Sequence, residues 1–366
     1  MKITIVGLAI TSSWGNGHAT TYRALARALR KRGHEIVFFE RDLEWYASNR
    51  DMPEPPFCRV HIYERWDEVV PSLRFELRDS DVAIIGSYSP DGIAASEEIL
   101  NASVPVKAFY DIDTPITVAK LRCGDREYLT PQLASGFDIY FSFTGGPLLR
   151  ELENEFGVAM AVPLYCSFDP ERYRTCTREP RFRCDLSYMG TYSPDRQEKL
   201  EHFFCAPARL LQNKQFLLAG PQYPKNIAWP RNVQTMIHLE PKFHPVFYNS
   251  SCFTLNITRK EMSANGYSPS VRLFEAAGSG AAIISDNWPG LQFFFTPGEE
   301  ILLASSTDDV VRFLTDISPA QRKLIARNAQ RRVLEEHSSG RRAQEFEDYI
   351  EAFLSRDRTP QDVLSA

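Results

Sequence analysis

Strand-like and helix-like stretches alternate along the chain, and this alternation limits its fold more than any other feature. The first apolar run spans residues 2–9 (KITIVGLA), and a helical pattern over residues 19–32 follows it. Further strand-like runs lie at residues 35–40, 59–63, 82–87, 105–110 and 139–143. The order strand, helix, strand predicts a parallel, doubly wound α/β sheet.

The alternation stops once and then starts again. Residues 167–184 (SFDPERYRTCTREPRFRC) are polar and contain two prolines, which is typical of a linker or crossover. After them, strand-like runs recur at residues 186–190, 216–219, 252–257, 281–285 and 301–303. A chain of 366 residues also exceeds what one hydrophobic core usually supports. We therefore expect Rossmann-like domains over residues 1–170 and 171–340. We expect a final helix, within residues 341–366, to pack back towards the first domain.

Charge and composition exclude several classes of protein. The formal net charge of −5 gives no support for a general nucleic-acid or membrane-surface binder. No apolar stretch reaches the roughly 18 residues that a membrane span needs, and the short first run is interpreted as a core strand rather than a signal peptide. The seven cysteines form no C-x-x-C pair, so we expect reduced thiols and a cytoplasmic protein. The oligomeric state is not indicated.

The motif Gly15-Asn16-Gly17-His18 joins the first strand to the first helix, and two interpretations compete for it. In a dehydrogenase it would be the nucleotide loop, with Glu40 at the end of the second strand binding a ribose. That turn needs its first glycine directly after the strand, whereas residues 10–14 intervene here, and Thr20 stands where a third small residue is needed. We therefore favour a loop on which Gly15, Asn16 and Gly17 let an acceptor approach the backbone closely.

A second candidate anion site lies in residues 258–290. Ser268 is predicted as the N-cap of a helix, with Pro269 at its first position and the helix running to residue 277. Its N-terminus would offer unpaired backbone N–H groups and a positive dipole end to a diphosphate. Glu275 stands roughly 8 to 9 Å further along the helix axis. A carboxylate at that distance is placed to accept hydrogen bonds from the ribose of the same nucleotide.

The stretch SPSVRLFEAAGSG (residues 268–280) resembles the C-terminal donor-binding domain of GT-B glycosyltransferases. More narrowly, it resembles the CgeB-like family of the spore maturation protein type. Stretches over most of the chain fit the same family, namely residues 12–25, 39–46, 110–115, 189–196 and 219–224. The resemblance implies two Rossmann-like domains that face each other across a cleft. It also implies a nucleotide-sugar donor on the C-terminal half and an acceptor on the N-terminal half.

Most candidate site residues belong to the donor half. Arg259, Lys260 and Arg272 add positive charge for phosphate, residues 190–192 end a strand at the ligand side of the sheet, and Arg196 is a further phosphate candidate. The donor-binding candidates are Gly190, Thr191, Tyr192, Arg196, His238, Arg259, Lys260, Tyr267, Ser268, Ser270, Arg272 and Glu275. In retaining relatives of the family 4 type two glutamates flank this helix. Glu275 matches the second, whereas Tyr267 stands at the first, so the stereochemical outcome is left open.

The expected reaction is displacement of a nucleoside diphosphate from the anomeric carbon of a sugar. His18 is the first candidate for the general base, because an imidazole at a helix N-terminus tends to stay unprotonated; Asp113 is the alternative base. Asp111 and Asp113 have the spacing of a metal pair but follow a strand of the acceptor half, so we expect no metal and no cofactor besides the donor. A nucleotide-sugar epimerase of the same fold and a non-catalytic nucleotide-sugar-binding protein are the alternatives.

Overall fold

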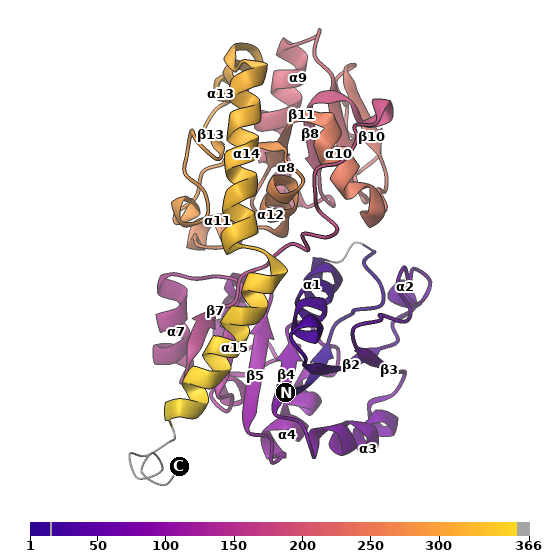
Figure 1. Cartoon of the computed structure of the whole chain (residues 1–366), viewed down its shortest axis with the longest axis vertical. Coiled ribbons are helices and arrows are strands. Elements are labelled where there is room, and N and C mark those ends of the chain that lie inside the picture. Colours follow the sequence, from indigo (N-terminus) through magenta and orange to yellow (C-terminus); the bar gives the residue numbers. More distant parts are fainter. Residues whose placement is uncertain (15–16, 357–366) are drawn as a thin grey trace. The chain divides into compact units, whose positions relative to one another are not determined.

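The computed structural model describes residues 1–14 and 17–356, which divide into two compact α/β units (Figure 1). The N-terminal unit contains Met1–Cys166 together with helix α15 (Ser339–Arg356), and the C-terminal unit contains Ser167–Ser338. Helix α15 packs on α1 (Gly17–Lys31), where Glu347 accepts a hydrogen bond from Arg32 Nε at 2.8 Å. The last helix among the described residues is therefore part of the first unit.

The N-terminal unit is built on a seven-stranded parallel sheet within the described residues, in the order β3-β2-β1-β4-β5-β6-β7. Its strands are β1 (Lys2–Gly7), β2 (Glu35–Arg41), β3 (Arg59–Tyr63), β4 (Val82–Gly86), β5 (Val106–Asp111), β6 (Ile139–Ser142) and β7 (Ala161–Pro163). Its other helices are α2 (Glu44–Ala47), α3 (Trp66–Leu77), α4 (Gly92–Asn101), α5 (Thr114–Cys123), α6 (Pro131–Ala134) and α7 (Pro147–Phe156).

The C-terminal unit repeats this plan with a six-stranded parallel sheet, again counting described residues, in the order β10-β9-β8-β11-β12-β13. Its strands are β8 (Cys184–Met189), β9 (Phe216–Ala219), β10 (Val233–Met236), β11 (Ser251–Asn256), β12 (Ala282–Asp286) and β13 (Leu302–Ala304). Its α-helices are α8 (Pro194–Leu200), α9 (Ala206–Leu210), α10 (His244–Ser250), α11 (Lys260–Asn265), α12 (Val271–Gly278), α13 (Thr307–Asp316) and α14 (Pro319–Glu336). Short turns of other helix types are η1 (Pro180–Phe182), η2 (Glu201–Cys205), η3 (Pro241–Phe243) and η4 (Leu291–Phe293).

Both sheets have the doubly wound strand order, and the predicted fold class is confirmed. In each sheet the order reverses between two central strands: β1 and β4 in the N-terminal unit, β8 and β11 in the C-terminal unit. Ligands of such sheets bind outside the carboxyl ends of the strands at this reversal point. A ligand site is therefore expected at the segments that follow these four strands.

The core of each unit lies against its central strands. In the C-terminal unit Leu186, Leu218, Leu255 and Ile284 come from four neighbouring strands and pack in one buried cluster. Parallel sheets are covered on both faces, so their strands are nearly continuous apolar runs. This is why the central strands were predictable from the sequence.

Several features of the fold were not predicted, among them the short edge strand β7. Strand β10 (VQTM) lies at the sheet edge and is half exposed, so its sequence has no apolar run. The helical stretch from Pro194 to Leu210 is interrupted by the π-helical turn η2, directly before Pro207 in α9. Proline lacks a backbone N–H and breaks the regular hydrogen-bond ladder, which explains the interruption.

Candidate active site

Asn256 organises the reversal point of the C-terminal sheet. It ends β11 and is buried. Its Oδ1 accepts hydrogen bonds from Ser270 Oγ at 2.8 Å and from Arg272 Nη1 at 3.0 Å, while its Nδ2 donates to Ser285 Oγ at 2.9 Å. These bonds fix the start of helix α12 beside the ends of β11 and β12. The sequence analysis did not single out Asn256, because the three partners just named lie 14 to 29 residues away in the chain.

Helix α12 begins at Val271, so the predicted start at Ser268 and Pro269 is wrong. Ser268 is buried with its Oγ 3.0 Å from Met262 Sδ, and Ser270 is the last extended residue before the helix. The Ser270 side chain bonds Asn256 instead of capping the helix. A helix N-terminus without a side-chain cap is suited to bind an anion.

Arg272 joins this helix to the end of β8. Its Nε donates to the carbonyl of Met189 at 2.6 Å, and its guanidinium lies 5.1 Å from the centre of the Tyr188 ring. A Cβ atom added to Gly190 would lie 2.9 Å from Arg272 Nη2, and one added to Gly220 would lie 1.9 Å from the Gly190 carbonyl oxygen. Gly220 is therefore required for the two strand ends to approach this closely, whereas a side chain at Gly190 would displace the guanidinium.

Glu275 is buried inside the unit, with 5% of its surface exposed. Burial raises the pKa of its carboxyl to about 7, although a hydrogen bond from Tyr173 and the charges of Arg172 and Arg272 act in the opposite direction. The Tyr173 hydroxyl also lies 3.3 Å from His244 Nδ1. Glu275 is thus held in a polar cluster beside the helix and changes its protonation near neutral pH.

Further predicted donor residues lie in the loops after the carboxyl ends of the strands, and each makes its own hydrogen bonds. Arg196 Nη2 donates to the carbonyl of Thr191 at 2.7 Å, and the Tyr192 N–H donates to the carbonyl of Pro221 at 3.0 Å. The Lys260 N–H donates to Asp195 Oδ2 at 3.1 Å.

Two more of the predicted residues follow strands that are separated in the sheet by β9 and β8. Arg259 directly precedes α11, and His238 is half-buried after β10, the outermost strand.

Lys199 and Asp286 were missed by the sequence analysis. Lys199 Nζ lies 2.6 Å from Asp286 Oδ2, and Asp286 Oδ1 accepts hydrogen bonds from the Thr258 N–H at 3.1 Å and Oγ1 at 2.9 Å. The ion pair shapes the loop that carries Arg259 and Lys260. Because Lys199 lies in an ordinary charged stretch, its sequence gave no signal of this role.

In the N-terminal unit, Glu40 is fully buried and holds the loop after β1. Its Oε2 accepts hydrogen bonds from the N–H groups of Ile10 at 2.6 Å and Thr11 at 2.9 Å. Its other oxygen accepts from the Thr11 hydroxyl. The carboxylate that a dehydrogenase would direct at a ribose is therefore engaged within the protein, which argues against the dinucleotide interpretation.

A second carboxylate holds the same loop from the other side. Asp51 receives two hydrogen bonds from the Arg23 guanidinium, at 2.8 and 2.9 Å, and one from the Ser13 N–H at 2.8 Å. Burial alone would raise the pKa of Asp51, but the ion pair with Arg23 and the bonds from Ser13 lower it to about 2. Residues 10–13 of the segment after β1 are thus hydrogen-bonded to the rest of the unit from both sides.

His18 is the second residue of α1 and is half-buried. Its ring packs edge-to-face with Tyr88, with the ring centres 5.4 Å apart. Burial lowers the pKa of the imidazole to about 4, so the ring is neutral at pH 7, as a proton acceptor must be. Gly17 opens the helix, whereas the predicted acceptor-loop residues Gly15 and Asn16 lie outside the described residues.

Asp113, the alternative base, precedes α5 and is half-buried. Its N–H donates to Asp111 Oδ1 at 3.1 Å, and Thr117 Oγ1 donates to the same oxygen at 2.9 Å. Asp111 is fully buried, which raises its pKa to about 6 despite a further hydrogen bond from Tyr140. Asp111 therefore supports the turn that carries Asp113. Over residues 1–14 and 17–356, no group of three or more His, Cys, Asp or Glu is placed to hold a metal.

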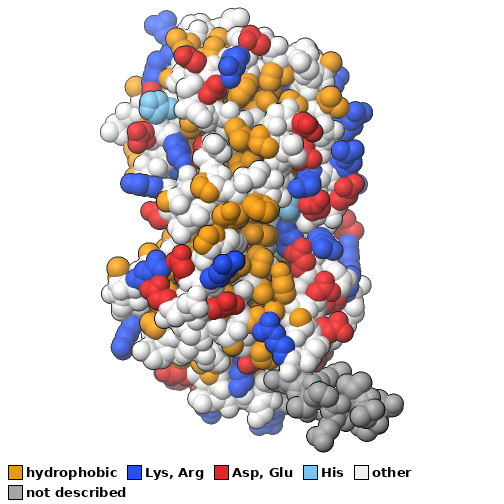
Figure 2. Space-filling model, turned by 90° about the vertical axis from the view of Figure 1, so that its left-hand side faces the viewer, with side chains coloured by type: hydrophobic (Ala, Val, Ile, Leu, Met, Phe, Trp, Pro, Cys, Tyr) orange, Lys and Arg blue, Asp and Glu red, His pale blue; other side chains and the backbone are white. Residues whose placement is uncertain are grey.

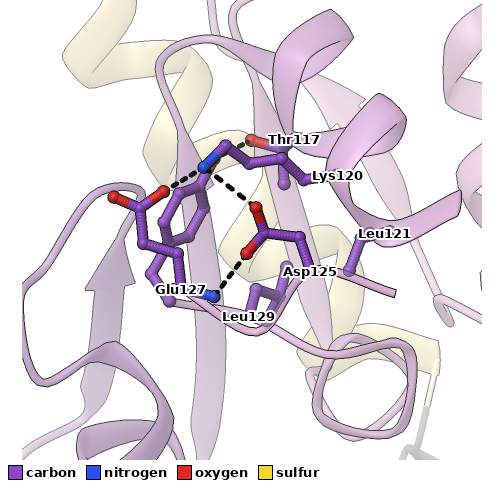
Figure 3. A pocket seen from close by; sticks show the side chains of 7 residues that line it. Thr117, Lys120, Leu121, Asp125, Glu127 and Leu129 are labelled. Atoms are coloured by element: carbon purple, nitrogen blue, oxygen red, sulfur yellow. Dashed lines mark hydrogen bonds and ion pairs between the residues drawn. The ribbon is translucent and has the colours of Figure 1, made fainter. Parts of the chain in front are cut away.

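A small pocket beside α5 contains a lysine whose charge is already balanced. Figure 3 shows Lys120 between Glu127 and Asp125, and its Nζ lies 3.4 Å from Asp125. The same Nζ lies 5.4 Å from the centre of the Tyr128 ring. We assign no ligand to this pocket.

The surface carries charges of both signs. On the face drawn in Figure 2, Lys and Arg side chains are interspersed with Asp and Glu side chains and with apolar ones. Among the helices that the structure describes, none is long and apolar enough to cross a membrane.

Comparison with known proteins adds a family match to this geometry. A family described as "Glycosyl transferase-like" matches residues 196–348, the region that contains β9 to β13, α12 and the residues bonded to Asn256. No curated protein matches the chain.

Solved structures match nearly the whole chain at low sequence identity. A sucrose-phosphate synthase from Thermosynechococcus elongatus is 13% identical with a TM-score of 0.68, covering 97% of this chain and 100% of its own. HepE from Anabaena, in complex with UDP and glucose, is 12% identical with a TM-score of 0.67, covering 96% and 100%. An alpha-glucosyltransferase in complex with UDP-glucose and DNA containing an abasic site is 13% identical with a TM-score of 0.70, covering 96% and 99%. The chain therefore has the GT-B glycosyltransferase fold, and its residues 196–348 are similar to a glycosyl transferase-like family.

Proposed function

We propose that this chain transfers a sugar from a nucleoside-diphosphate sugar to an acceptor. The observation that carries the proposal is the cluster at the reversal point of the C-terminal sheet, inside the matched glycosyl transferase-like region. There the uncapped N-terminus of α12, the Arg272 guanidinium and the buried Glu275 carboxyl belong to one helix. These are the groups that a diphosphate and its ribose need.

The donor is assigned to this cluster group by group. The diphosphate binds the N–H groups of the first turn of α12, with Arg272, Arg259 and Lys260 supplying positive charge. Glu275 accepts hydrogen bonds from the ribose hydroxyls, and the nucleobase lies near His238. UDP in the HepE structure supports a uridine nucleotide as the first candidate.

The acceptor is assigned to the N-terminal unit. The acceptor hydroxyl gives its proton to the neutral imidazole of His18 as its oxygen bonds the anomeric carbon. The bond from that carbon to the diphosphate oxygen breaks, and the nucleoside diphosphate leaves with the electron pair. Asp113 is the alternative base. Because basic side chains and the helix dipole offset the charge of the leaving group, we propose that no metal is required.

Three narrower assignments complete the proposal. Sequence stretches over most of the chain support membership of the CgeB-like family. Free thiols at all seven cysteines support a reducing compartment such as the cytoplasm. The net charge of −5 and the mixed surface charge support a small molecule, glycan or protein as acceptor rather than a nucleic acid.

A thermal-shift screen of nucleoside diphosphates and their sugars tests the proposal. We expect at least one nucleotide sugar to raise the melting temperature, and Glu275→Ala to remove most of that shift. Glu198→Ala, which removes an exposed carboxylate from the same unit, is the matched control and should keep the shift. Stabilisation by no nucleotide would contradict the proposed function.

A further inference from the structure

We propose that Tyr267 and Phe293 form a rigid aromatic platform on which the sugar ring of the donor stacks. The assignment rests on the proposed function, since it names the sugar subsite of the same donor site. It adds Phe293, which neither the family match nor the sequence motifs single out. The platform is defined as the two rings together, one from the segment before α12 and one from η4.

Tyr267 is held in a backbone conformation that side-chain-bearing residues rarely adopt. Its φ is +50°, and among the described non-glycine residues only Tyr88 and Gln222 share a positive φ. Its N–H donates to the carbonyl of Pro289 at 2.7 Å, which fixes the strained segment. Strained residues of this kind concentrate at functional sites, where the surrounding structure maintains them.

Two glycines make the position of the Tyr267 ring possible. Gly290 has a φ of +86°, and a Cβ atom there would lie 2.4 Å from Tyr267 Cδ1. Gly266 has a φ of +71°, and its Cβ would lie 2.4 Å from the carbonyl oxygen of Pro289. Any other residue at either position would push the ring or the Pro289 segment away. The sequence therefore maintains three unusual backbone positions to hold one ring.

Phe293 completes the platform and faces solvent. Its side chain is 61% exposed, whereas the next two residues, Phe294 and Phe295, are buried in the unit. The centres of the Phe293 and Tyr267 rings lie 5.4 Å apart with an angle of 45° between the ring planes. An exposed aromatic ring next to a second ring whose backbone is held in place is a surface ready for an apolar face of a ligand.

The platform lies next to the proposed diphosphate site. Tyr267 precedes Ser270, the N-cap of α12, by three residues, which span at most roughly 10 Å. A sugar bonded to a diphosphate at the first turn of α12 is thus within reach of the rings. A pyranose carries C–H groups on one face and hydroxyls around its rim, so it can stack on an aromatic surface while its hydroxyls remain hydrogen-bonded.

Isothermal titration of Phe293→Ala with UDP and with a UDP-sugar separates the sugar subsite from the nucleotide site. The sugar used is the tightest-binding of UDP-glucose, UDP-galactose and UDP-N-acetylglucosamine. We expect the Kd of the UDP-sugar to rise roughly tenfold and the Kd of UDP to stay within twofold. Phe75→Ala removes a phenylalanine of similar exposure, 63%, from the N-terminal unit, and should change neither value.

Tyr267→Asn supplies a second variant, because asparagine tolerates a positive φ while lacking the ring. It should weaken binding of the UDP-sugar alone, with an unchanged melting temperature for the free protein. If the variants weaken the binding of UDP and of the UDP-sugar equally, or change neither Kd, the proposed platform is wrong and the proposed function remains. Failure of the unaltered chain to bind any nucleotide would overturn both.

Discussion

The two units have the same strand order, yet the segments at their reversal points differ in how their polar groups are used. In the N-terminal unit the Glu40 carboxylate accepts hydrogen bonds from Ile10 and Thr11 and so holds the segment after β1 in place. In the C-terminal unit Glu275 is also buried, but its pKa is raised to about 7 and the nearby helix N-terminus has no side-chain cap. One carboxylate stabilises a loop, whereas ionisation of the other costs stability near neutral pH, and we propose that it binds the ribose of the donor.

Removal of the proposed base should have the largest effect. We expect His18→Ala to lower the transfer rate by roughly 10²- to 10⁴-fold, because general base catalysis contributes about that much. The donor Kd should stay unchanged, since the donor is assigned to the other unit. Rate measurements with the donor and acceptor identified by screening provide the test. Strong residual activity would move the base to Asp113 or to the substrate.

Substitution of Glu40 should destabilise the protein. In Glu40→Gln one acceptor oxygen becomes an NH₂ group facing buried donors, and we expect a loss of about 3 kcal/mol in the free energy of unfolding. Urea unfolding measures this loss. Glu44→Gln changes an exposed glutamate of the same unit and should stay within about 0.5 kcal/mol of the unaltered chain. Equal stability of Glu40→Gln and the unaltered chain would refute the role given to Glu40.

The same substitution at Glu275 should have the opposite sign. The folded-state pKa of about 7 exceeds the unfolded value of 4.5, so ionisation of Glu275 costs stability as the pH rises from 4.5 to 7. A neutral glutamine avoids this cost, and Glu275→Gln should be more stable by about 3 kcal/mol at pH 8 and nearly equal in stability below pH 4.5. Melting temperatures at pH 4.5 and pH 8 give the comparison. A variant that melts lower at pH 8 would show that ionisation of Glu275 does not cost the folded protein stability.

Asp51 should show a smaller effect with the reverse dependence on pH. Its pKa is lowered to about 2 in the folded protein, so its contribution is present above the unfolded value of 3.8 and is lost as the pH falls through 2. Because its side chain is 38% exposed, we expect Asp51→Asn to cost only about 1 kcal/mol at pH 7. Acid titration of both proteins, followed by circular dichroism, should show this difference shrinking towards pH 2. If the difference in stability between the two proteins does not change with pH, it does not arise from the ionisation of Asp51.

The sequence predicted the central strands and the helix that carries Glu275, because buried parallel strands and amphipathic helices leave local patterns. It did not predict the edge strand β10, which has no apolar run, or the start of α12. The α12 boundary depends on the bond between Ser270 and Asn256, which are 14 residues apart. Glu40 accepts hydrogen bonds from residues 29 to 30 positions away, and a local sequence pattern cannot predict such contacts either. Non-local polar contacts thus account for the parts of the site that were missed.

Hydrogen exchange measured with and without UDP tests the central claim most directly. We predict that UDP slows exchange in residues 189–196 and 268–275, where the end of β8 and the first turn of α12 meet. Exchange in residues 8–14 and 18–25 of the N-terminal unit should stay unchanged. Protection confined to the N-terminal segments would place the nucleotide on the other sheet and contradict the account.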